Sequence, residues 1–143
     1  MPKQAKPSVK KSVPRKDKVT SGLTQVLKRL RSVDTTITGV AVVNTDGQVI
    51  AEHLPRQAQK SRLGNIAAMM LSIGQQTVAE FEHGELEHVL IESENGFTLI
   101  TTASPNTILV VLARPDAKLG SLFLQTNRAA EEIRGLFDQG NNR

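Results

Sequence analysis

The sequence predicts an α/β domain, an α+β sandwich in which a five-stranded antiparallel sheet carries helices on both faces. Five short runs rich in β-branched residues alternate with three segments of helical periodicity. The turn dipeptides Asp46-Gly47 and Asn95-Gly96 join neighbouring strands as hairpins, which makes the sheet antiparallel. The runs Gly39–Val43 and Thr107–Ala113 are apolar on both sides of the pleat, so they need helices above and below.

The length and composition fit one globular domain. The chain has 143 residues, of which 38% are hydrophobic and 22% are charged. Cysteine is absent, which excludes disulfides and thiolate chemistry. No apolar run approaches about 18 residues, and the basic start lacks the apolar stretch of a signal peptide. A cytoplasmic protein is therefore expected.

The first eighteen residues differ from the rest of the chain. Residues 1–18 hold seven of the eighteen Lys and Arg and one acid, a charge of +6, whereas the remainder has eleven bases and thirteen acids, a charge of −2. Its three prolines and the absence of aromatic residues predict a disordered basic tail over 1–18. A folded domain is expected over 19–139, followed by a disordered end over 140–143. The tail bases available to an anionic membrane surface or to an acidic partner are Lys3, Lys6, Lys10, Lys11, Arg15, Lys16 and Lys18. Nucleic acid is not expected as a partner because no aromatic residue lies between them; a solvated extension without a partner is the alternative.

The domain begins with a helix and a hairpin. A first helix is expected from Thr20 or Ser21, either of which suits an N-cap, to about Ser32. Two strands follow within residues 37–51. Leu54-Pro55 ends the second strand, since proline cannot continue a paired strand.

The longest helix is expected over residues 60–81, and it bears two apolar stripes. The first stripe consists of Leu63, Ile66, Met70, Ile73, Thr77 and Phe81. The second, built mainly of small residues, consists of Gly64, Ala67, Ala68, Leu71, Gly74 and Val78. Together they span about 200° of the helix, whereas a surface helix needs an apolar stripe of about 100°. We therefore predict that one stripe packs on the sheet and the other on a partner; burial of both within one domain is the alternative.

Three strands and a closing helix complete the chain. The runs Leu86–Ser93 and Phe97–Ala103 form a hairpin, and a helix is expected from Leu119 to Phe137. The segment Leu86–Glu92 contains none of the Pro, Lys or Gly residues that protect edge strands. It is therefore predicted to be an open edge that pairs with another chain.

The sequence carries no pattern for catalysis, metal or cofactor binding. His53, His83 and His88 stand outside the HxxxH and HExxH spacings, so zinc is not expected. The GxxxxGK[ST] phosphate loop, the GxGxxG dinucleotide motif and the G-x-S-x-G nucleophile elbow are all missing from the sequence. A binding protein is expected, without enzymatic activity and without a cofactor.

The chain resembles the Roadblock/LC7 family over about residues 20–137. The resemblance rests on TGVAVVNTDGQVIA, the apolar helix and VLIESENGFTLITTASPNTILVVLARPDAKLGSLFLQTNRAAEEIR, most specifically on the block from Asn95-Gly96 to Leu119-Gly120. It implies the profilin-like topology α-β-β-α-β-β-β-α, with one long helix on one face of the sheet and two on the other. No catalytic motif defines the family, and the basic tail lies outside its pattern.

The resemblance also implies partners. Family members pair as homodimers or with other members by joining sheet edges and middle helices. The interface predicted here consists of Gly64, Ala67, Ala68, Leu71, Gly74, Gln75, Val78, Leu86, His88 and Leu90. Members of the family bind and regulate Ras-like small GTPases, scaffold membrane complexes or serve as dynein light chains. A homodimeric, non-enzymatic regulator of a Ras-like small GTPase is therefore expected, activating or tethering it in a polarity or motility system as in the bacterial members. The alternative is a structural adaptor without effect on nucleotide turnover.

Overall fold

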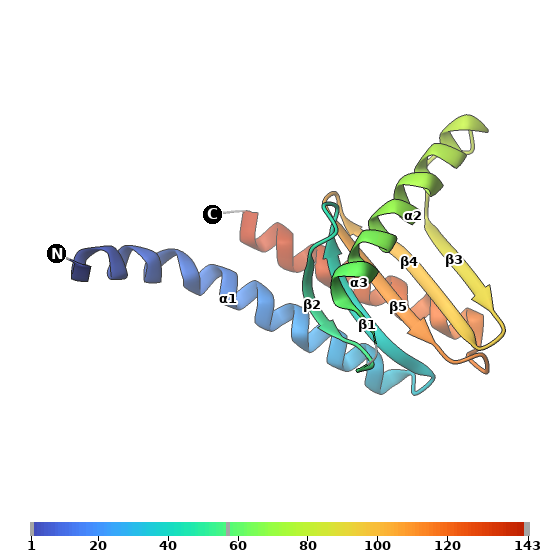
Figure 1. Ribbon diagram of the computed structural model, residues 1–143, viewed down its shortest axis with the longest axis horizontal. Helices are drawn as coiled ribbons and strands as arrows, with labels where there is room; N and C mark the ends of the chain where they lie inside the picture. Colours follow the sequence, from blue (N-terminus) through green and yellow to red (C-terminus); the bar gives the residue numbers. More distant parts are fainter. Residues whose placement is uncertain (1, 57, 142–143) are drawn as a thin grey trace.

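The fold is a five-stranded sheet between helical layers. The structure, a computed structural model, describes residues 2–56 and 58–141. The elements in chain order are α1 (Pro2–Val33), β1 (Ile37–Asn44), β2 (Val49–His53), α2 (Lys60–Glu80), β3 (His88–Ser93), β4 (Gly96–Ser104), β5 (Thr107–Ala113) and α3 (Leu119–Asn141). All neighbouring strands are antiparallel, in the order β2-β1-β5-β4-β3. α2 covers one face and α1 and α3 cover the other (Figure 1), which confirms the predicted fold.

The sheet separates two apolar cores. Val40 and Val42 of β1 point into the core beneath α1 and α3, whereas Ala41 and Val43 point into the core beneath α2. All four side chains are fully buried, as is Val110 of β5. This confirms the prediction that the central strands are apolar on both sides because helices cover both of their faces.

α1 is longer than the sequence predicts. The helix starts at Pro2, whereas a start at Thr20 or Ser21 was expected after a disordered tail. A buried row of leucines, Leu23, Leu27 and Leu30, fixes the C-terminal half of α1 against the sheet. Extending a helix that is already formed costs less than nucleating one, and Lys, Gln and Ala favour the extension. Pro7 and Pro14 oppose it, because each removes one main-chain donor from the helix. The helix therefore begins before the start that the capping residues predict.

The closing helix α3 is also longer than the predicted helix, which ends at Phe137. α3 continues to Asn141, beyond the expected end of the domain at residue 139. Residues 1, 57, 142 and 143 lie outside the described residues. Within the described part of the chain, no helix is long and apolar enough to cross a membrane.

The hairpin between β3 and β4 turns one residue earlier than predicted. Ser93 pairs with Gly96, so the loop consists of Glu94 and Asn95 rather than Asn95-Gly96. A Cβ on Gly96 would lie 2.6 Å from the carbonyl oxygen of Ala113 on β5. The glycine is therefore required for the close approach of another strand and not for the turn.

Candidate functional site

The solvent side of α2 carries a row of exposed apolar side chains. Ile66, Met69 and Ile73 are 43%, 60% and 54% exposed, and Phe81, directly after the helix, is 63% exposed. These four residues, which we call the α2 ridge, recur at helical spacing on one side. Single exposed apolar residues are common on protein surfaces, but several large ones along one side of a helix indicate an interaction surface.

The small-residue stripe of α2 faces the sheet of its own chain. Gly64 lies against the β1–β2 turn so closely that a Cβ would overlap the carbonyl oxygen of Gly47. Ala67 is fully buried and Leu71 is 4% exposed, both in the core with β1, β4 and β5. The prediction that Gly64, Ala67 and Leu71 face a partner is therefore wrong. The small residues instead bring the helix close to the sheet. Leu63 and Met70 of the first stripe also pack against this core, whereas Ile66 and Ile73 of the same stripe face solvent.

The remaining predicted positions on α2 are divided between sheet and solvent. A Cβ on Gly74 would lie 2.9 Å from Cγ2 of Val89, so Gly74 also faces the sheet. Ala68 and Val78 are half-buried, and Gln75 is exposed. Gln75 is therefore the one exposed residue of the predicted α2 interface.

β3 forms an open edge of the sheet, as predicted, since β4 is its one neighbour within the sheet. The side chains of β3 are less available for contact with a partner chain than the sequence predicts. The His88 ring stacks on Phe123 of α3 with ring centroids 4.7 Å apart, and Leu90 packs against the core beneath α1 and α3. Ile91, which points to the other face, is 37% exposed. The main chain of β3 and Ile91 therefore remain open to a partner, whereas the side chains of His88 and Leu90 are occupied within the chain.

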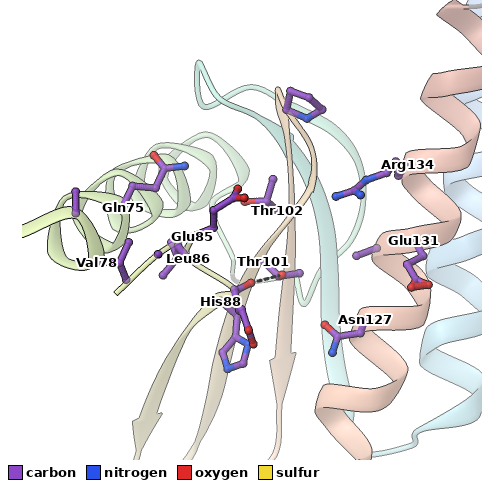
Figure 2. A pocket seen from close by; sticks show the side chains of 15 residues that line it. Gln75, Val78, Glu85, Leu86, His88, Thr101, Thr102, Asn127, Glu131 and Arg134 are labelled. Atoms are coloured by element: carbon purple, nitrogen blue, oxygen red, sulfur yellow. Dashed lines mark hydrogen bonds between the residues drawn. The ribbon is translucent and has the colours of Figure 1, made fainter. Parts of the chain in front are cut away.

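A groove of about 740 Å³ lies at the end of the sheet, between α2 and α3 (Figure 2). Gln75, Val78 and Leu86 form one side, Asn127, Glu131 and Arg134 form the other, and Thr101 and Thr102 of β4 lie between them. Leu86, a predicted interface residue, therefore lies in this groove, half-buried against the α2 core.

Two hydrogen bonds fix the walls of the groove. Thr101 Oγ1 donates to the carbonyl oxygen of Glu87 over 2.9 Å, and Arg134 Nε donates to the carbonyl oxygen of Ala103 over 3.2 Å. Across the described residues, no group of three or more His, Asp and Glu side chains is arranged to hold a metal ion.

An ion pair secures the start of α2. The Lys60 ammonium donates a hydrogen bond that holds the pKa of the Glu52 carboxyl below its ordinary value of 4.5. The main-chain N–H of Leu54 donates to the same carboxylate over 2.9 Å and lowers the pKa further. The pair joins the end of β2 to the first turn of α2, and so helps to position the helix that bears the ridge.

Comparison with known proteins identifies the fold and the family. The model of the Roadblock/LC7 domain family matches residues 23–113, from α1 to the end of β5. The uncharacterized protein MJ1340 of Methanocaldococcus jannaschii is 39% identical over 101 residues, which cover 71% of this chain and 88% of that protein. Among solved structures, Myxococcus xanthus MglB superposes with a TM-score of 0.78 at 20% identity, over 85% of this chain and 91% of that chain.

A second solved structure, described as MglB with a tetrameric arrangement, has a TM-score of 0.76 at 17% identity, over 85% of this chain and 92% of that chain. At these identities the structural likeness establishes the fold. The family match, which spans all five strands and α2, establishes the family. The chain belongs to the Roadblock/LC7 family of regulatory and adaptor domains.

Proposed function

We propose that the chain forms a two-fold homodimer through the α2 ridge and the β3 edge, and that this dimer regulates or tethers a Ras-like small GTPase. The exposure of the ridge carries the proposal. A two-fold axis brings the same patch of both copies together, so each ridge residue contributes one buried side chain from each subunit. The tetrameric arrangement described for one MglB supports self-association of this chain.

The charges beside the ridge favour an antiparallel pair of α2 helices. Arg62 and Glu80 are both exposed and lie five helical turns apart, on the side of α2 that carries Met69 and Ile73. A two-fold axis crossing α2 near its middle makes the two helices antiparallel and places Arg62 beside the partner's Glu80. One axis thus covers the apolar ridge and pairs a charge at each end of it.

The proposed partner follows from the family. The resemblance of the sequence implies binding of Ras-like small GTPases, and this sequence has no phosphate loop of its own. In the proposed complex the GTPase holds the nucleotide, and the dimer acts by positioning groups of the GTPase or by holding the GTPase in place.

The test uses the purified chain and purified small P-loop GTPases from the same organism, each loaded with GTP or with GDP. Binding is measured by titration calorimetry, and GTP hydrolysis is measured with and without the chain. Binding with faster hydrolysis supports regulation, and binding with unchanged hydrolysis supports tethering. If none of these GTPases binds in either nucleotide state, the proposed function is wrong.

A further inference from the structure

We infer that the groove at the end of the sheet receives the basic N-terminal segment, residues 1–18, of another copy of this chain. This inference concerns contacts beyond the proposed dimer and does not depend on a GTPase. It rests on the carboxylates in the groove, the charge of the surrounding segment, and the position of α1 relative to the groove.

Carboxylates dominate the charge of the groove. Glu85, Glu87 and Glu131 line it, against a single arginine, Arg134. Arg134 donates its Nε–H to the main chain at Ala103, which holds its side chain at one wall. Among the residues that the structure describes, the ion pairs are Arg29–Glu132, Lys60–Glu52 and Arg114–Asp116. The carboxylates of the groove are therefore not neutralised by the described part of their own chain.

The segment around the groove strengthens its negative potential. Residues 80–94, which run from the end of α2 through β3, contain six glutamates and no lysine or arginine. Clustered charges of one sign, set in a concave surface, attract a segment of opposite charge. The matching segment within this chain is residues 1–18, with seven bases and one acid.

The shape of the groove suits lysine side chains. A lysine has a compact ammonium at the end of a flexible four-carbon stem. Val78 and Leu86 offer an apolar wall to the stem, while Glu85 and Glu131 lie on opposite sides of the groove (Figure 2). A volume of about 740 Å³ admits several such side chains.

The basic segment of the same copy does not meet this groove. α1 starts far from the sheet at one end of the molecule, whereas the end of α2 and β3 lie at the opposite end (Figure 1). α1 runs unbroken over 32 residues, about 48 Å of helix, which carries its start away from the groove. The segment of one copy therefore contacts the groove of another. Such a contact joins two different surfaces and links copies into rings or chains.

Cross-linking of the full chain tests this contact directly. Unlabelled and ¹⁵N-labelled chains are mixed in equal amounts and treated with a carbodiimide, which couples lysine amines to carboxylates without a spacer. We expect peptide pairs of mixed isotope that join lysines of residues 1–18 to Glu85, Glu87 or Glu131. These pairs should disappear when the salt is raised from about 0.01 M to about 1 M, because the Debye length falls from about 30 Å to about 3 Å.

Sedimentation with matched variants provides a second test. Glu85→Gln/Glu131→Gln removes two carboxylates from the groove, and Asp46→Asn/Asp138→Asn removes two exposed carboxylates elsewhere. At low salt the fraction of protein in species larger than the dimer should fall at least tenfold in the groove variant. In the control variant this fraction should stay as in wild type. Both variants should melt at the wild-type temperature, because all four side chains are exposed.

Three results would overturn the inference. Cross-links confined to isotopically pure pairs would show that each segment contacts its own copy. Equal loss of assembly in the groove variant and the control would show that net charge, rather than the groove, is responsible. If deletion of residues 1–18 leaves sedimentation unchanged but abolishes binding to phosphatidylserine vesicles, the segment binds a lipid surface instead.

Discussion

Replacing Ile73 with alanine should weaken the proposed dimer without unfolding the subunit. Fully burying an isoleucine side chain stabilises by about 1.5–3 kcal/mol. Ile73 is 54% exposed in the single chain, so covering it contributes about half of that per subunit, and the two-fold axis doubles the effect. Alanine keeps one methyl group, so the expected loss is about 1–2.5 kcal/mol per dimer, or roughly a five- to sixtyfold rise in the dimer Kd.

The assay is sedimentation equilibrium or light scattering over a dilution series, with two comparison variants. Ser72→Ala changes an exposed side chain about 100° around α2 from Ile73 and should leave the Kd unchanged. Leu71→Ala removes a core contact and should lower the free energy of unfolding by about 2–5 kcal/mol. An Ile73→Ala protein with the Kd of wild type, or a wild type that is monomeric at high concentration, would show that the ridge is not the dimer contact.

Three further predictions concern other parts of the molecule. Arg62→Glu and Glu80→Arg should each weaken the dimer, and the double variant should restore it; failure of rescue in light scattering would contradict the antiparallel pairing of α2. Val110→Ala should lower the free energy of unfolding by about 1–3 kcal/mol in urea titrations at fixed protein concentration, since this fully buried valine leaves a cavity. Because Lys60 lowers the pKa of Glu52, their pair stabilises fully above pH 4.5 and is lost as the pH falls through the lowered pKa. Thermal melts of Glu52→Gln should lack this pH-dependent part of the stability, which is under about 1 kcal/mol for a partly exposed pair. If the melting temperature of the variant falls with acid as in wild type, the pair is not the source of that dependence.

Most of the fold could be predicted from the sequence because the signals for it are local or compositional. Runs rich in β-branched residues, joined by turn dipeptides, defined the strands, and runs such as Thr107–Ala113, apolar on both sides, predicted burial from both faces. The segment that became β3 lacks the residues that protect edge strands, and the strand order places it at an edge of the sheet; its pairing with another chain stays a prediction. These features depend on the spacing of residues along one segment.

The candidate site was predicted less well, because it depends on which surfaces meet. The sequence by itself determined that α2 has an apolar arc wider than one sheet contact requires, and this width predicted a partner for part of the arc. Periodicity gives the width of that arc but not its orientation. Only the tertiary structure decided that Gly64, Ala67 and Leu71 face the sheet while Ile66, Met69 and Ile73 face solvent.

The physical reason is the close approach of Gly64 to the main chain at Gly47, a contact between two segments that no local pattern encodes. The groove has the same origin, since its carboxylates come from the loop before β3 and from α3, more than forty residues apart in the sequence. Its shape arises where β4 extends past the start of β3, which the register of the sheet determines. The sequence determined which residues the chain has for binding, and packing decided which of them reach the surface together.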